Sequence, residues 1–205
     1  MKRALFGVAS ATAVAVLAGC TSNDQGHDMS RMPTGPSTSN SSTSASAAGG
    51  QHNDTDAAFA TQMIPHHGQA IEMADMALDK ANSTQVKAFA SRIKAAQSPE
   101  IEKMSGWLEG WNVPVPSTTM SHNQHGMSMP GEMSAAEMAE LASAAGGAFD
   151  KMWVAMMIRH HAGAVDMSRN VLTNGQNIDV KTLAQSIITS QTAEIAQLQQ
   201  LLTSL

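Results

Sequence analysis

Two long stretches of the chain repeat the same order of apolar and polar positions. Sliding the sequence against itself by 94 positions aligns residues 56–108 with residues 150–202 without a gap, and 16 of the 53 pairs are identical. Within each copy, apolar residues recur every three or four positions over two consecutive segments, which is the period of an amphipathic helix. The pattern therefore predicts a helical hairpin that occurs twice.

Turn-forming residues separate the two helical segments of each copy. Residues 82–83 (Asn-Ser) and 175–177 (Gly-Gln-Asn) interrupt the apolar period, and Asp56 or Asp150 stands where each first helix should begin. We expect these aspartates to be N-caps. Pro99 should kink or restart the second helix of the first copy, because proline lacks the backbone N–H.

Neither hairpin can bury its apolar stripe alone, and two of them pack most simply as a four-helix bundle. The sequence therefore predicts an all-α fold. Residues 134–145 continue the helical period and predict a short extra helix. Residues 112–133, which join the repeats, are rich in Pro, Ser, His and Met and predict a mobile loop.

The first 19 residues have the pattern of a secretory signal. Three residues with two basic side chains precede an uncharged apolar run over residues 4–18, and Cys20, the only cysteine, follows shortly after. The run is shorter than the roughly 20 residues that span a membrane. The residues around Cys20 resemble a bacterial lipobox, which predicts a lipoprotein signal peptide over residues 1–19 and lipid attachment at Cys20. The alternative is an ordinary signal peptide with a chance cysteine.

Residues 20–52 are expected to be a flexible tether. Residues 34–50 contain only Thr, Gly, Pro, Ser, Asn and Ala, which bury too little apolar surface to offset the entropy of ordering the chain. Residues 53–205 remain, and their number is typical of one domain. The formal net charge of −5 provides no basic surface, which argues against nucleic acid as a partner.

Methionine is unusually abundant: the 205 residues include 16 methionines, whereas aromatic residues make up 3%. Several of these methionines share the buried stripe with adjacent histidines, and glutamates lie on the facing helices. The candidate metal ligands of this core are His66, His67, His160, His161, Met63, Met157, Met73, Met167, Glu100 and Glu194. Pseudo-symmetry should bring four imidazoles and four thioethers to the centre of the bundle.

Imidazole and thioether together suit Cu(I), whereas carboxylate-rich sites suit iron, manganese or magnesium. The Glu-x-x-His motifs of di-iron bundles are absent from the His-His runs, so copper is favoured, although another transition metal is possible. Glu100 and Glu194 either bind the metal or accept an N–H from a histidine. The alternative is a structural network, in which the histidines are hydrogen-bonded and the methionines only fill the core.

The loop offers a second set of soft donors that have no helical stripe to fill. These are His122, His125, Met127 and Met129. Exposed methionine is uncommon, and capture of a soft metal ion is one explanation. Drift of a low-complexity segment is the other.

The runs Met63–Met73 and Met157–Met167 resemble those of a ferritin-like domain-of-unknown-function family of secreted bacterial proteins, and the resemblance extends over residues 53–205. It implies a ferritin-like four-helix bundle. The family includes periplasmic copper-binding proteins, so the resemblance also implies copper binding and copper tolerance through Met and His. Pro65 of the first copy is replaced by Arg159 in the second, so the two His-His sites need not be equivalent.

The sequence thus predicts an extracytoplasmic, lipid-anchored protein that binds Cu(I), either to sequester it or to pass it to a copper-handling protein. Two alternatives stay open. One is a metal-dependent oxidase, in which the metal would do the chemistry because no nucleophile motif is present. The other is a non-metal envelope protein with a structural His/Glu core.

Overall fold

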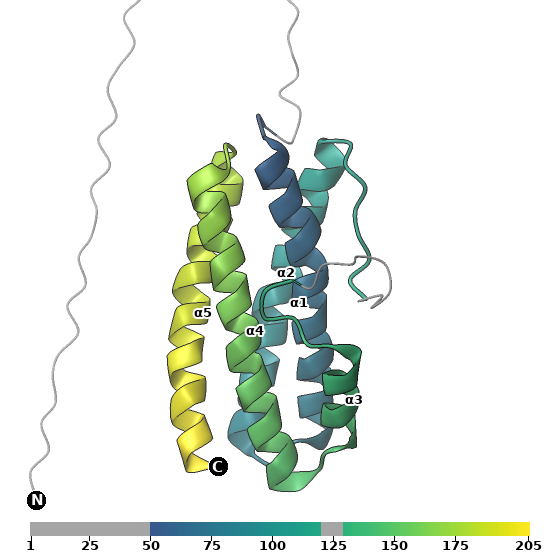
Figure 1. The fold of residues 1–205 in the computed structure, drawn as a ribbon, viewed down its shortest axis with the longest axis vertical. Helices are drawn as coiled ribbons and strands as arrows, with labels where there is room; N and C mark the ends of the chain where they lie inside the picture. Colours follow the sequence, from purple (N-terminus) through teal and green to yellow (C-terminus); the bar gives the residue numbers. More distant parts are fainter. Residues whose placement is uncertain (1–49, 120–128) are drawn as a thin grey trace, which may run out of the picture. The chain divides into compact units, whose positions relative to one another are not determined.

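Four long helices, arranged as two hairpins, make up most of the part of the chain that the structure describes, and a short helix precedes the second hairpin (Figure 1). The computed structural model describes residues 50–119 and 129–205, which belong to one compact unit. The helices are α1 (Asp54–Lys80), α2 (Thr84–Gly110), α3 (Ala135–Ser143), α4 (Gly146–Asn174) and α5 (Ile178–Ser204). Helix α1 packs against α2, α4 against α5, and α1 against α4. The predicted all-α, ferritin-like four-helix bundle built from two hairpins is confirmed.

The helix ends follow the turn residues of the sequence. The side chain of Ser83 caps α2, and that of Asn177 caps α5. The extra helix expected over residues 134–145 is α3, which begins with a reciprocal capping box between Ser134 and Glu137. Helix α2 continues through Pro99 as one helix, so it does not restart there, whereas a kink at this position stays a prediction. The proline removes only one backbone hydrogen bond of the helix.

Asp56 and Asp150 are not the N-caps of their helices, so this expectation was wrong. The α4 cap is Ala145, which makes no side-chain bond, and the α1 cap is Asn53, which forms a reciprocal capping box with Asp56. Asp56 also accepts hydrogen bonds from the backbone N–H groups of residues 176 and 177, at 2.9 and 3.0 Å. Asp150 accepts equivalent bonds from residues 82 and 83, at 3.0 and 2.8 Å. Each aspartate therefore fastens the turn of the other repeat.

Replacing Asp150 with alanine is expected to lower the free energy of unfolding by about 2 kcal/mol, because it removes two charge-assisted hydrogen bonds to the start of α2. Asp54→Ala, at an exposed position in the first turn of α1, is the matched control. Urea unfolding of both variants measures the difference. Equal stability of the two would contradict the role of Asp150 in holding the hairpins together.

Two apolar clusters fill the bundle, and the repeat relates one to the other. One contains Met73 and Met157, and the second contains Met63 and Met167. Each of these residues has its counterpart 94 positions away in the opposite cluster. The buried histidines of α1 and α4 belong to neither cluster and lie along the helices between the two methionine positions. No helix of the described residues is long and apolar enough to cross a membrane.

Candidate metal centre

Four histidines from α1 and α4 meet in the middle of the bundle. His66, His67, His160 and His161 are all fully buried. The rings of His66 and His160 lie against each other across the α1–α4 contact, with centroids 3.8 Å apart and an interplanar angle of 34°. The duplicated motif therefore places one histidine of each copy at the junction between the two repeats.

The other histidine of each copy pairs with a glutamate of its own hairpin. His67 Nε2 lies 2.7 Å from Glu100 Oε2, and His161 Nε2 lies 2.7 Å from Glu194 Oε2. The glutamate side chains are 18% and 20% exposed, whereas their histidines are fully buried. Each carboxylate thus links a buried imidazole to solvent. We call these four histidines and two glutamates the histidine layer.

Three of the four imidazoles have one ring nitrogen bound to a protein oxygen. An ionised carboxylate or a carbonyl can only accept, so Nε2 donates in His67, in His161 and in His66, which lies 3.1 Å from the carbonyl of Pro130. In a neutral ring, Nδ1 is then the nitrogen with the lone pair. Among the described residues, no well-formed hydrogen bond reaches these three Nδ1 atoms or either ring nitrogen of His160. Histidine ligands of metals have the same arrangement, in which the second ring nitrogen donates to a carboxylate or carbonyl.

Burial keeps the two central histidines neutral. The pKa of His66 falls from 6.5 to about 3, chiefly through burial and next through the neighbouring His67, while the hydrogen bond to the Pro130 carbonyl opposes the change. The pKa of His160 also lies well below 6.5, chiefly because the ring is buried and next because His66 is close to it. Neutral imidazole is the form that binds metal ions.

The four core methionines flank the layer on both sides. Met63 precedes His66 and His67 by three and four residues on α1, and Met157 stands in the same relation to His160 and His161 on α4. Residues three and four apart are neighbours on a helix surface, so each copy sets a thioether beside its imidazoles. Met73 and Met167 lie one and a half to two turns beyond the histidines, in the opposite clusters.

No three His, Cys, Asp or Glu side chains among residues 50–119 and 129–205 converge as a metal site. The histidines come together as the sequence predicts, but Glu100, Glu194 and the Pro130 carbonyl each hold one Nε2 atom. The two glutamates therefore act as hydrogen-bond acceptors in this arrangement. A site in the layer would combine imidazole Nδ1 atoms with methionine sulfur.

Three of the four loop candidates, His122, His125 and Met127, lie outside the described residues. Cys20 lies outside them as well. Met129 is described: it is half-buried and packs against the cluster that contains Met63.

Residues 129–133, which we call the strap, lie beside the histidine layer and contact α1. The sequence pattern did not predict this contact. The side-chain amide of Gln69 makes two hydrogen bonds of 2.8 Å to the backbone of Met133. Gly163 allows the strap to approach α4, because a Cβ there would lie 1.8 Å from the Pro130 carbonyl oxygen. Gln69 and Gly163 occupy equivalent positions of the two copies. The two copies differ at this position, and that difference is the feature of the sequence that could have pointed to the strap.

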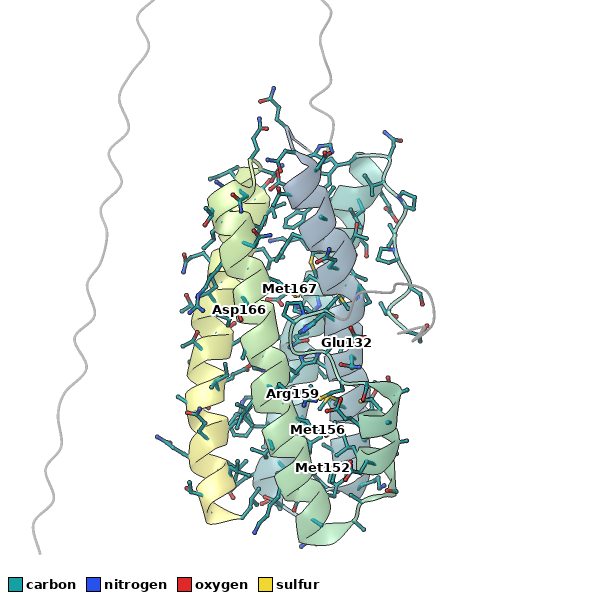
Figure 2. The ribbon with its side chains drawn as sticks, viewed as in Figure 1. Glu132, Met152, Met156, Arg159, Asp166 and Met167 are labelled. Atoms are coloured by element: carbon teal, nitrogen blue, oxygen red, sulfur yellow. The ribbon has the colours of Figure 1, made fainter. Side chains whose placement is uncertain are left out.

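The strap also explains the exchange of Pro65 for Arg159. Figure 2 shows Arg159 on α4, beside α3. Its guanidinium contacts Glu137 of α3 and the sulfur of Met133. Only the second copy needs such a side chain, because α3 packs against α4. The two His-His motifs are therefore inequivalent: the Pro130 carbonyl holds His66 but not His160.

Comparisons with known proteins identify the family of the chain and support its fold. The profile of a family described as "Domain of unknown function (DUF305)" matches residues 56–202. A DUF305 protein from Streptomyces coelicolor, described as secreted, has 32% identity and a TM-score of 0.66, covering 73% of this chain and 93% of that chain. The Cu(II)-bound form of CopM has 38% identity, a TM-score of 0.63 and coverages of 73% and 96%. The Cu(I)-bound form has 36% identity, a TM-score of 0.61 and coverages of 74% and 98%. No curated protein sequence matches the chain at a significant level.

Proposed function

Because this chain belongs to the DUF305 family, we propose that it binds copper outside the cytoplasm, as Cu(I), and either sequesters it or passes it to a copper-handling protein. The observation that carries this proposal is the set of buried imidazole nitrogens without a protein partner. Buried polar groups in proteins are nearly always paired, and each unpaired one is destabilising. Copper bound to a structural relative in two oxidation states supports the choice of metal.

The donor set favours the cuprous ion. Methionine sulfur is a soft ligand that suits Cu(I), and four methionines flank the layer. The carboxylates of Glu100 and Glu194 bring negative charge to His67 and His161 without occupying their Nδ1 atoms. That charge favours a bound cation in a buried site.

A competition titration tests the proposal. The purified protein is titrated anaerobically with Cu(I) in the presence of a colorimetric Cu(I) chelator. His67→Ala combined with His161→Ala is expected to weaken binding by about 100-fold, because two Nδ1 donors are lost. His52→Ala is the matched control, since His52 is an exposed histidine that stacks on Trp111, 4.2 Å away. Wild-type protein that takes no copper from the chelator would refute the function.

The remaining candidates extend this proposal. We place lipid attachment at Cys20, and soft-metal capture at His122, His125, Met127 and Met129 of the loop. Mass spectrometry of the mature N-terminus distinguishes a lipidated Cys20 from a free thiol. Changing His122, His125 and Met127 to serine in the same titration separates copper held by the loop from copper held by the core.

A further inference from the structure

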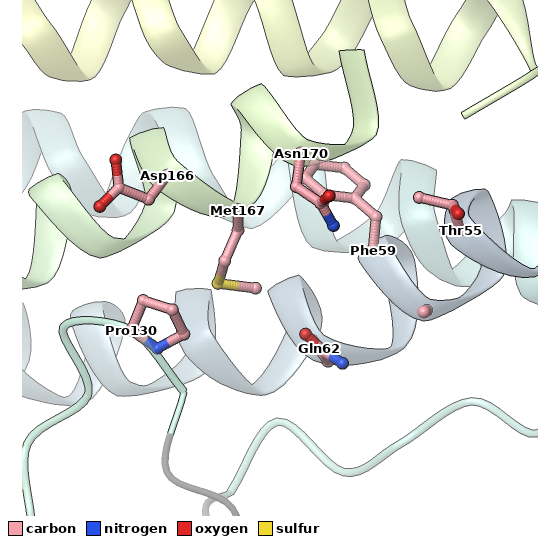
Figure 3. Close-up of a pocket in the computed structure, with 8 residues that line it drawn as sticks. Thr55, Phe59, Gln62, Pro130, Asp166, Met167 and Asn170 are labelled. Carbon is pink, nitrogen blue, oxygen red and sulfur yellow. The ribbon is translucent and has the colours of Figure 1, made fainter. Parts of the chain in front are cut away.

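An open cavity of about 310 Å³ lies in the groove between α1 and α4, beside the strap (Figure 3). Its lining residues are Thr55, Ala58, Phe59, Gln62, Pro130, Asp166, Met167 and Asn170. Figure 3 shows the Met167 sulfur pointing into the space between Pro130 and Gln62. The lining contains a carboxylate and amide groups but no lysine or arginine. A cation would therefore meet no positive charge among these side chains.

The repeat shows what fills the equivalent groove at the other end of the bundle. The counterparts of Thr55, Ala58, Gln62 and Asn170 are, in order, Phe149, Met152, Met156 and Met76. These large apolar side chains belong to or pack against the cluster that contains Met138 and Leu141 of α3. One groove is thus filled with apolar side chains beneath α3, whereas small and polar side chains leave its counterpart hollow. The cavity exists because the second repeat departs from the first at these positions.

The open groove gives one core methionine access to solvent. Met63, Met73 and Met157 are fully buried, whereas Met167 is 8% exposed and lines the cavity. Pro130 forms another wall of the cavity, and its carbonyl oxygen is the atom bound to His66 Nε2. The cavity and the histidine layer therefore meet at the strap.

We propose that this cavity is the port through which a soft monovalent cation reaches the histidine layer, with the Met167 thioether as its first ligand. This inference rests on the proposed function and adds the path by which the cation enters from solvent. Thioether sulfur is neutral and binds soft cations without a prior deprotonation step. The carboxylate of Asp166 at the rim attracts cations, although it is also paired with Arg169 at 3.1 Å. The other three core methionines have no exposed surface with which to receive an ion.

Rapid mixing with Ag(I), a soft monovalent ion that stays in one oxidation state, tests the port. The fluorescence of the three tryptophans follows binding. Ala58→Phe fills the cavity without removing a donor and is expected to slow association about tenfold, with the same amount of silver bound at the end. Met167→Leu keeps the side-chain size and is expected to slow association to a similar degree. Ala95→Phe, at an exposed alanine of α2, is the matched control and should bind at the wild-type rate.

The outcomes separate the port from the proposed function. A wild-type association rate in Ala58→Phe would overturn the port, even if Met167→Leu were slow, because the sulfur would then act within the layer. Wild-type protein that binds no silver would instead overturn the function on which the port rests. Thermal unfolding of each variant, followed by circular dichroism, verifies that slow binding does not reflect loss of fold.

Discussion

Acidification from pH 6.5 to pH 5 is expected to destabilise the metal-free protein by about 2 kcal/mol through His66, with a further loss of the same sign through His160. The reason is that His66 and His160 are buried and neutral in the folded state, with pKa values of about 3 and well below 6.5, respectively. In the unfolded chain both regain an ordinary pKa of 6.5. Below that pH the unfolded state binds more protons than the folded state, so stability falls, and well below pH 6.5 the slope through His66 approaches about 1.4 kcal/mol per pH unit.

The sign of this effect is opposite to that of a histidine stabilised by a carboxylate. A lowered histidine pKa gives full stability above pH 6.5 and a progressive loss as the pH falls towards the folded-state value. Glu137 does not interfere in this window. Its pKa is lowered to about 2, first by the backbone N–H of Ser134 and then by Arg159, so its contribution is lost only below its ordinary value of 4.5.

Urea unfolding of metal-free protein at a series of pH values between 5 and 8 measures this effect. We expect a plateau above about pH 7 and a decline below pH 6.5. A His52→Ala control should show the same decline, because its site is exposed. A free energy of unfolding that stays constant down to pH 5 would show that the central histidines are not held neutral by burial.

The sequence predicts the hairpins and the meeting of the histidines because both follow from local periodicity and duplication. The apolar stripe of each copy must face its counterpart, which carries His66 and His160 to the α1–α4 contact. For Glu100 and Glu194 the sequence left two roles open, namely binding the metal or accepting an N–H from a histidine. Helical spacing places a glutamate on the facing helix, but only side-chain rotamers decide whether it binds a histidine or a metal.

Contacts between the repeats were not predictable in the same way. Asp56 and Asp150 look like N-caps in sequence, yet each binds a turn about 120 or 68 residues away along the chain. The strap was likewise hidden, since nothing local indicates that Gln69 binds the backbone of Met133. These contacts depend on how the two hairpins pack, and they appear in sequence only as positions where one copy departs from the other.

Replacing His160 with leucine is expected to stabilise the metal-free protein by about 1–3 kcal/mol at pH 7 and to weaken Cu(I) binding by about 100-fold. Both ring nitrogens of His160 are buried and make no well-formed hydrogen bond to the described residues, so an apolar side chain of similar size removes a poorly paired polar group. The same replacement should reduce the loss of stability on acidification, because His160 then no longer gains a proton on unfolding.

His66→Leu is the matched comparison, because it changes the other ring of the His66–His160 contact. His66 binds the Pro130 carbonyl, so its replacement removes a hydrogen bond and is expected to give no gain in stability, or a loss of about 1 kcal/mol. Urea unfolding of both variants at pH 7, combined with the Cu(I) competition titration, measures the two effects together. A structural role for His160 predicts the reverse, namely lower stability of His160→Leu with unchanged copper affinity. Higher stability without copper, together with weaker binding, would show that His160 is retained for the metal and not for the fold.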